Sequence, residues 1–189
     1  MIILASGSPR RAELLAQVGI DFQVQVAAVD ETVHADERAA DYVERVSIAK
    51  ARTVHRAYPQ YPVLGSDTAV VLDQQILGKP ADRDDAVRML LALGGRTHEV
   101  LTGVAVVAAT THYRVNVSRV SLRAVSEREA AAYWDTGEPV DKAGGYAIQG
   151  RAAAFIERIE GSYSGIMGLP LFETMQILSA VGVHGRWQV

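Results

Sequence analysis

Hydrophobic residues recur along the chain with two spacings, which together predict alternating strands and helices. The all-apolar run Ile2–Ala5 is typical of a strand buried on both faces, and Phe22, Val24 and Val26 alternate with glutamines as in a half-buried strand. The predicted strands are Ile2–Ala5, Phe22–Val26, Val63–Leu72, Ile76–Leu77, Val100–Val107, Tyr113–Leu122 and Phe155–Ile159. The predicted helices are Pro9–Val18, Ala39–Ala57, Asp82–Leu93, a helix from the capping box at Ser126 to Gly137, and Pro170–Val181.

The order of these elements predicts the fold class. Strands and helices alternate early in the chain, whereas Val100–Val107 and Tyr113–Leu122 form a predicted hairpin. This combination indicates an α/β fold with a mixed β-sheet flanked by helices. Two glycine-rich segments, 141–150 and 161–165, are expected to be loops. With 189 residues, no repeats and no linker-like stretch, residues 1–189 are expected to form one domain, either compact or elongated with two lobes.

Composition and charge narrow the class of protein. A net charge of −3 argues against a protein that coats nucleic acid or an acidic membrane surface. The chain has no cysteine, which excludes disulfides and cysteine chemistry and fits the reducing cytoplasm, where we expect the protein. No apolar stretch reaches the length of a transmembrane helix, and the opening apolar run is too short for a signal peptide. We therefore expect neither a nucleic-acid polymer nor a membrane as partner.

The most unusual local feature is a pair of arginines at the start of the first predicted helix. Ser8 is the expected N-cap and Pro9 the first helical residue, so Arg10 and Arg11 fall in the first turn. Acidic residues are normally favoured there, because the helix N-terminus carries a positive partial charge. Free backbone N–H groups, the small loop at Ser6–Ser8 and two guanidinium groups favour a bound polyphosphate. The alternative is a pair of solvated surface arginines.

Two carboxylates and a lysine stand out further along the chain. Asp67 interrupts the apolar strand Val63–Leu72, and a buried carboxylate needs a cation, a metal or hydrogen bonds; the alternative is an aspartate turned to solvent. Glu31 follows a strand and, with Asp67, supplies oxygen ligands for Mg²⁺ or Mn²⁺, which substrate phosphates and water would complete. Lys50 lies beside the buried stripe of the helix Ala39–Ala57, either as a snorkelling lysine or at the edge of an anion site.

Several well-known motifs are missing from the sequence. The chain lacks GxxxxGK[ST], GxGxxG, HExxH and GxSxG, which argues against a P-loop nucleotidase, a dinucleotide-binding protein, a zinc hydrolase and a serine hydrolase. Two acids, two arginines, Lys50 and Lys79 suffice to bind a metal–triphosphate and to hydrolyse it with activated water. These residues alone leave open which phosphorus is attacked.

Six short segments, in order along almost the whole chain, resemble the Maf family of septum-formation-inhibitor-like nucleoside triphosphate pyrophosphatases. They are Ser6–Arg11, Gly65–Thr68, Gly78–Pro80, Gly95–Val100, Asp141–Tyr146 and Gly161–Ser164. The resemblance implies hydrolysis of a nucleoside triphosphate to the monophosphate and pyrophosphate with a divalent metal, Mg or Mn. It also implies an elongated fold with a central cleft between two lobes, similar to inosine triphosphate pyrophosphatases, and a homodimer.

The resemblance further implies roles for single residues. Glu31 and Asp67 would serve the metal and the attacking water, with Asp67 as the proton acceptor. The residues that would contact the substrate phosphates or base are Ser6, Arg10, Arg11, Lys50 and Lys79. Arg11, Thr68 and Gln149 match positions that accompany base selection.

The branch of the family follows from the glycine-rich segment. Ala147–Gly150 resembles the branch that acts on dTTP and UTP, and the Gln149 amide can both donate to and accept from a pyrimidine edge. Two departures from the family pattern are Ser66, where alanine is frequent, and Gly165–Met167, where Asn-Val-Val is frequent. The alternatives are a pyrophosphatase for modified or purine nucleotides such as 7-methyl-GTP or ITP, and a nucleotide-sensing division regulator.

Overall fold

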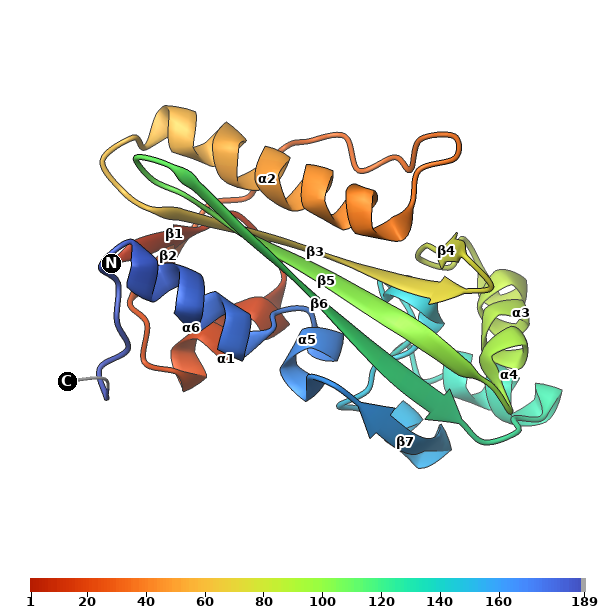
Figure 1. The fold of residues 1–189 in the computed structure, drawn as a ribbon. Coiled ribbons are helices and arrows are strands. Elements are labelled where there is room, and N and C mark those ends of the chain that lie inside the picture. Colours follow the sequence, from red (N-terminus) through yellow and green to blue (C-terminus); the bar gives the residue numbers. More distant parts are fainter. Residues whose placement is uncertain (188–189) are drawn as a thin grey trace.

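The computed structural model describes residues 1–187, in which seven strands form one mixed sheet (Figure 1). β1 (Ile2–Leu4) pairs in parallel with β2 (Phe22–Val24) and β3 (Val63–Leu72), and the other pairings are antiparallel. The remaining strands are β4 (Gln75–Leu77), β5 (Thr97–Val107), β6 (Thr111–Leu122) and β7 (Ile156–Glu160). The sheet order is β2-β1-β3-β5-β6-β7, with β4 beside β3. The predicted α/β fold with a mixed sheet is confirmed.

Helices cover both faces of the sheet. The α-helices are α1 (Pro9–Gln17), α2 (Ala39–Ala57), α3 (Arg83–Leu93), α4 (Glu127–Trp134), α5 (Tyr163–Met167) and α6 (Leu171–Ala180), and the 3-10 helices are η1 (Ala143–Gly145) and η2 (Arg151–Phe155). α2 packs on one face against β3, β5 and β6, while α1, α5 and α6 lie on the opposite face (Figure 1). α3 and α4 pack against each other at the far end of the sheet (Figure 1).

Two glycines allow α2 to lie directly on the sheet. A Cβ atom at Gly65 of β3 would collide with the carbonyl oxygen of Ser47, and one at Gly103 of β5 would collide with that of Val43. Both carbonyls belong to α2, so any larger residue at either position would push the helix away. This close approach brings the next turn of α2, which carries Lys50, within reach of the sheet.

Two of the local expectations are wrong. Val24 and Val26 are 45% and 71% exposed, so of the stretch predicted to be half-buried only Phe22 packs against the core; β2 is an edge strand and pairs on one side with β1 alone. The segment 161–165, expected to be a loop, contains the first residues of α5. The Ser162 side chain caps that helix by accepting from the backbone N–H of Gly165 at 3.0 Å. A helix of five residues is too short to leave a periodic pattern in the sequence.

Candidate active site

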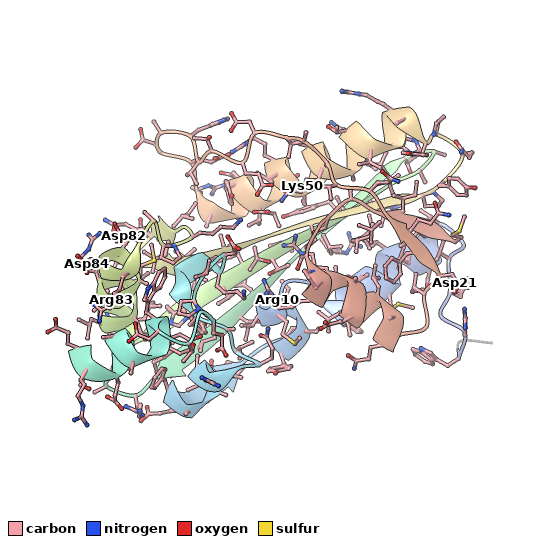
Figure 2. All side chains as sticks on the ribbon, turned by 180° about the vertical axis from the view of Figure 1, so that it is seen from behind. Arg10, Asp21, Lys50, Asp82, Arg83 and Asp84 are labelled. Carbon is pink, nitrogen blue, oxygen red and sulfur yellow. The ribbon has the colours of Figure 1, made fainter. Side chains whose placement is uncertain are left out.

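The residues singled out from the sequence line one cleft of about 800 Å³. The cleft is bounded by the β1–α1 loop, the β2–α2 loop, α2, β3, the loop after β4 and the segments 141–149 and 166–168. The singled-out residues that line it are Ser6, Arg10, Arg11, Glu31, Lys50, Asp67, Thr68, Lys79 and Gln149. Figure 2 shows Arg10 and Lys50 near the middle of the molecule, away from Asp21 at one end and Asp82 at the other. Their gathering is observed, whereas their individual roles stay predictions.

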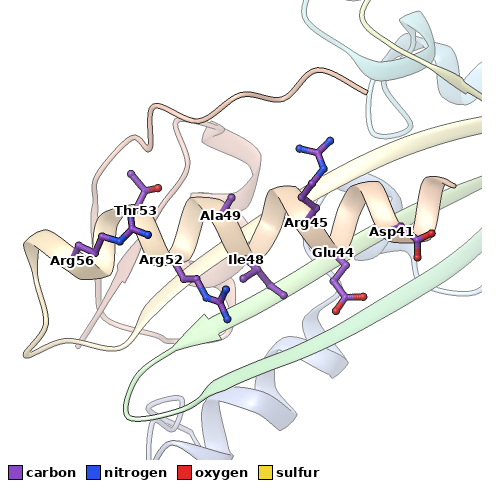
Figure 3. Close-up of a pocket in the computed structure, with 8 residues that line it drawn as sticks. All are labelled: Asp41, Glu44, Arg45, Ile48, Ala49, Arg52, Thr53 and Arg56. Atoms are coloured by element: carbon purple, nitrogen blue, oxygen red, sulfur yellow. The ribbon is translucent and has the colours of Figure 1, made fainter. Parts of the chain in front are cut away.

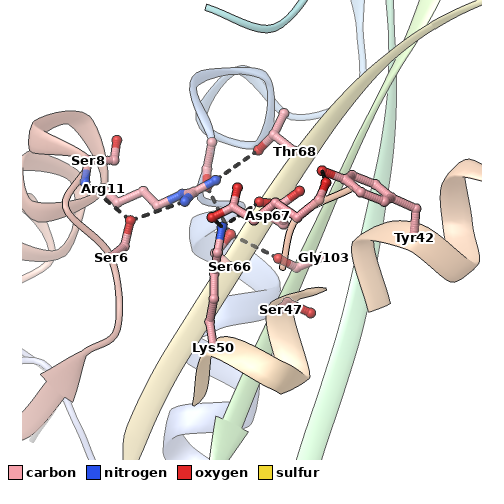
Figure 4. Close-up of polar contacts among 12 residues, drawn as sticks. Ser6, Ser8, Arg11, Tyr42, Ser47, Lys50, Ser66, Asp67, Thr68 and Gly103 are labelled. Carbon is pink, nitrogen blue, oxygen red and sulfur yellow. Dashed lines mark hydrogen bonds and ion pairs between the residues drawn. The ribbon is translucent and has the colours of Figure 1, made fainter. Parts of the chain in front are cut away.

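A buried ion pair lies at the centre of the cleft. Lys50 and Asp67 are only 7% and 5% exposed, and Lys50 Nζ lies 2.7 Å from Asp67 Oδ1 (Figure 4). The same ammonium group lies 3.0 Å from Oε1 of Glu31, whose side chain is about half exposed. Lys50 is therefore not a snorkelling surface lysine, and Asp67 has the cationic partner that its burial requires.

Tyr42 adds a hydroxyl group to this cluster. Its O–H donates to the backbone carbonyl of Glu31 at 3.3 Å, and its ring lines the cleft. Burial, together with the negative charges of Asp67 and Glu31, raises the pKa of Tyr42, so its phenol stays protonated. Tyr42 was not singled out from the sequence, because an aromatic residue in an apolar helix stripe gives no sign of a polar contact.

Arg11 braces the cleft through contacts with protein acceptors. Its Nε donates to the Gly168 carbonyl at 2.8 Å, and its Nη1 to Ser6 Oγ at 3.1 Å (Figure 4). The hydroxyl of Ser66 also contacts the Gly168 carbonyl, at 3.0 Å. Burial lowers the pKa of Arg11, while the charges of Asp67 and Glu31 act in the opposite direction. Arg11 is therefore half-buried and hydrogen-bonded, unlike a solvated surface arginine.

The helix start differs from expectation in one detail. Ser8 occupies the N-cap position of α1 and Pro9 follows it, but the Ser8 side chain forms no capping hydrogen bond. Its backbone N–H instead donates to Ser6 Oγ at 3.2 Å, so the loop folds back on itself before the helix begins. The first turn contains no acidic residue, and Arg10 points into the cleft.

Three cleft cations have no carboxylate partner. Within residues 1–187, none of Arg10, Lys79 and Lys142 belongs to an ion pair, although all three line the cleft. Burial and the positive charges of Arg10 and Lys79 lower the pKa of Lys142, against the opposing effects of Asp141 and Glu138. The sequence included Lys142 in a motif but gave it no role. Such a group of like charges favours a multivalent anion.

The segment that carries Gln149 is fixed from behind by a polar network. The backbone N–H of Ala147 donates to the Tyr133 hydroxyl at 3.1 Å, and that hydroxyl donates to Glu138 Oε1 at 2.7 Å. The backbone N–H of Arg151 donates to Glu138 Oε2 at 3.0 Å. Burial alone would raise the pKa of Glu138, but these hydrogen bonds outweigh it and lower the pKa. Gln149 itself is exposed at the tip of this fixed segment.

A second buried pair holds the start of the same segment. Nε2 of His98 lies 2.8 Å from the hydroxyl of Tyr146, and the two rings meet edge to face. His98 is 2% exposed, and burial lowers its pKa to about 4, so it is neutral near pH 7. Its Nδ1 is buried without a hydrogen-bond partner. The Gly144 N–H donates to the Gly78 carbonyl at 2.9 Å and joins the segment to the loop that carries Lys79.

Comparison with known proteins decides the family. A family model described as "Maf-like protein" matches residues 1–181. The chain belongs to the Maf family. It is 52% identical over 186 residues to the "dTTP/UTP pyrophosphatase" of Hahella chejuensis, with 96% of this chain and 92% of the relative covered. It is 50% identical to the protein of the same name from Alkalilimnicola ehrlichii, with 94% of this chain and 91% of the relative covered.

Solved structures of low sequence identity resemble this Maf-family chain in part. The nucleoside-triphosphatase (dITP/XTP pyrophosphatase) of Mycobacterium abscessus is 16% identical, with a TM-score of 0.44 over 66% of this chain and 74% of that one. The Ham1 protein of Staphylococcus aureus is 14% identical, with a TM-score of 0.48 over 82% and 90%.

Two carboxylates in the Maf-family cleft are of a type that a divalent cation can bind. No group of three or more His, Cys, Asp or Glu side chains suited to a metal is found within residues 1–187. Glu31 and Asp67 nevertheless contact the same Lys50 ammonium group, so their carboxylates lie close together. Mg²⁺ typically takes one or two carboxylates and completes its shell with substrate phosphates and water.

A second hollow, of about 540 Å³, lies along α2 (Figure 3). Its lining side chains all belong to that helix, and they are Asp41, Glu44, Arg45, Ile48, Ala49, Arg52, Thr53 and Arg56. It contains none of the residues singled out from the sequence. In the described part of this Maf-family chain, no helix is long and apolar enough to span a membrane.

Proposed function

We propose that this chain hydrolyses dTTP and UTP to the nucleoside monophosphate and pyrophosphate. The observation that carries the proposal is the composition of the cleft. One part of the cleft contains the carboxylates of Asp67 and Glu31 around the buried Lys50. Another part of the cleft contains three cations without carboxylate partners, which are Arg10, Lys79 and Lys142. Relatives about 50% identical over nearly the whole chain are named dTTP/UTP pyrophosphatases, which supports the same substrates here.

The cations supply the electrostatic part of catalysis. Arg10, Lys79 and Lys142 bind the β- and γ-phosphates and stabilise the negative charge that develops on the leaving pyrophosphate. Preorganised charges of this kind are usually the largest single contribution to the rate of phosphoryl transfer. Because the three side chains have no carboxylate partners, binding the substrate breaks no ion pair.

Asp67 is the proposed proton acceptor. The oxygen of water bonds to the α-phosphorus, the bond from that phosphorus to its bridging oxygen breaks, and the proton passes to the Asp67 carboxylate. The ion pair with Lys50 fixes the position of this carboxylate. A Mg²⁺ or Mn²⁺ ion, held by Glu31 and Asp67, would neutralise phosphate charge and lower the pKa of bound water.

Base recognition is assigned to Gln149, opposite α2, together with Arg11 and Thr68 on α1 and β3. The Gln149 amide can donate to O4 of thymine or uracil, and the polar network behind it restricts its movement. Arg11 and Thr68 complete the expected base-selecting set. Apolar side chains that line the cleft nearby, among them Ile148 and Met167, provide a surface for the flat base.

The decisive experiment is product analysis with dTTP and UTP in the presence of Mg²⁺ or Mn²⁺. Monophosphate and pyrophosphate are the expected products, whereas diphosphate and orthophosphate would overturn the proposal. A substrate panel tests the base preference, because dTTP and UTP should be hydrolysed faster than 7-methyl-GTP and ITP. A role as a division regulator would instead be supported if the Asp67→Asn variant kept its full effect in cells.

Two further expectations belong to this proposal. We expect a homodimer and a cytoplasmic location, the first from the family resemblance and the second from the absence of cysteine. Light scattering of the purified chain measures its mass in solution, and a monomer across the micromolar range would contradict the dimer. Cell fractionation tests the location.

A further inference from the structure

Two threonines face each other across strands β3 and β5, next to the base-selecting residues. Thr68 and Thr102 are direct partners in the strand register, and their Oγ1 atoms lie 2.9 Å apart. Thr68 lines the cleft, whereas Thr102 lies behind it and is only 1% exposed. Oγ1 of Thr102 also lies 2.8 Å from the carbonyl oxygen of Gly165.

These distances fix the direction of the hydroxyl protons. A carbonyl oxygen can only accept, so the single proton of the Thr102 hydroxyl points to Gly165. In the 2.9 Å contact between the two hydroxyls, Thr68 must therefore be the donor and Thr102 the acceptor. On its other side Thr68 accepts from Arg11 Nη2 at 3.4 Å. Hydrogen bonds therefore run in one direction, from Arg11 through Thr68 and Thr102 to Gly165, as Figure 4 shows for the first step.

This series of hydrogen bonds leaves the Thr68 hydroxyl with one free lone pair and no free proton. A hydroxyl oxygen has two acceptor positions, and Arg11 uses one of them. Any substrate group that meets Thr68 directly must therefore be a hydrogen-bond donor. Phosphate oxygens at neutral pH are acceptors, so the partner comes from the base or the sugar.

We propose that Thr102 is a positioning residue that fixes Thr68 as an acceptor for the N3–H group of thymine and uracil. That group is the only ring N–H donor of these bases in a nucleotide. Cytosine has an unprotonated N3 at the same position, so it would face a second acceptor and bind more weakly than uracil. The inference rests on the proposed function, and it adds a reason for selection among the pyrimidines.

The test compares UTP with CTP in wild type and in Thr102→Val. Valine keeps the shape of threonine but cannot accept a hydrogen bond, so the Thr68 hydroxyl becomes free to turn and donate to cytosine N3. We expect the ratio of kcat/KM for UTP over CTP to fall about tenfold, mostly through KM. The Gly165 carbonyl still accepts from the Gly168 N–H at 2.9 Å, which limits the structural cost.

Two control variants distinguish proton direction from packing. Thr102→Ser retains the hydroxyl and should keep the wild-type ratio. Thr97→Val removes a similar cross-strand hydroxyl contact, with Ser121 at 2.7 Å, on the exposed surface and should also have no effect on the ratio.

The outcomes for this inference and for the proposed function are separable. If the wild type fails to hydrolyse UTP, the proposed function is wrong. If the wild type hydrolyses UTP but does not prefer it to CTP, or if Thr102→Val keeps the wild-type ratio, Thr102 does not act in this way. A Thr102→Ser variant that behaves like Thr102→Val would show a packing role and would also overturn the inference.

Discussion

The two walls of the cleft are built on different principles. The wall formed by α2 and β3 is charged, and its central groups Lys50, Asp67 and Glu31 compensate one another directly. The wall formed by residues 143–149 presents mainly apolar and neutral groups, and hydrogen bonds from behind the cleft hold it in shape. In the first wall the polar side chains face the substrate. In the second, most of them support the backbone.

This difference separates most of the chemistry from most of the recognition, and Thr68, which follows Asp67 on β3, is the recognition residue on the charged wall. Changes in the charged wall should alter the rate of the chemical step, whereas changes behind the neutral wall should alter substrate affinity and selectivity. Residues outside the cleft, such as Glu138 and His98, also affect the site, because their hydrogen bonds hold the neutral wall in position. Four predictions test this division.

The largest effect is expected for Asp67→Asn. Removing the proton acceptor should lower kcat at least about a hundredfold, the low end for general-base catalysis, while KM changes little. Steady-state kinetics with dTTP measures the effect, and the melting temperature verifies folding. Asp41→Asn is a matched control, because Asp41 pairs with Arg38 on the surface at 2.7 Å. Near-normal turnover of a folded Asp67→Asn enzyme would show that the charged wall does not supply the proton acceptor.

Lys50→Met should have the next largest effect, on stability. It leaves the carboxylate of Asp67 buried without its cation, which should lower the free energy of unfolding by about 3 kcal/mol. Urea denaturation measures the loss. The Lys50→Met/Asp67→Asn double variant should lose less, because its buried side chain is uncharged. Arg38→Met is the exposed counterpart and should cost much less, because solvent screens a surface ion pair. Equal losses for the two single variants would contradict the importance of burial.

The neutral wall should respond to pH through His98. Because burial lowers the pKa of His98 to about 4, the unfolded chain binds this proton first as the pH falls below 6.5. Its contribution to stability is therefore complete above pH 6.5 and is lost progressively down to pH 4, by about 2 kcal/mol between pH 7 and pH 5. In His98→Phe, stability should depend less steeply on pH over this range. Identical slopes for wild type and variant would mean that His98 is not held neutral.

The smallest effect is expected for Tyr133→Phe. Loss of the hydroxyl removes one partner each from the Ala147 N–H and the Glu138 carboxylate, which should cost about 1 kcal/mol of stability. KM for UTP should rise while kcat stays within about twofold, since the proton acceptor is untouched. Tyr113→Phe, a half-buried tyrosine outside the cleft, is the control. A fall in kcat without a change in KM would place Tyr133 with the charged wall.

Much of the charged wall could be predicted from the sequence. Asp67 is conspicuous because it interrupts an apolar strand, and Arg10 and Arg11 because they stand where acidic residues are favoured. The sequence indicated that a buried Asp67 needs a partner, but it did not predict the pairing with Lys50. The two residues are 17 positions apart, on a helix and on a strand. Their contact depends on how these two elements align in space, and hydrophobic periodicity does not reveal that alignment.

The support of the neutral wall could not be predicted in this way. Glu138 accepts from the backbone N–H groups of Arg151 and Ala152, and any residue type other than proline offers such a donor. His98 and Tyr146 lie 48 positions apart and meet only once the sheet has formed. The burial predicted for Phe22–Val26 fails at Val24 and Val26 for a related reason, because the sequence does not reveal which strand becomes an edge.

The glycines that let α2 rest on the sheet have a consequence for how this enzyme can vary. Gly65 and Gly103 act as spacers, and the missing side chains determine how far the Lys50 ammonium reaches toward Asp67. An alanine at either position would change no polar residue of the cleft. It would nevertheless push α2 outward and move Lys50 away from Asp67. Searches for altered specificity should therefore hold both glycines constant and diversify the opposite wall, where shape can change without disturbing the ion pair.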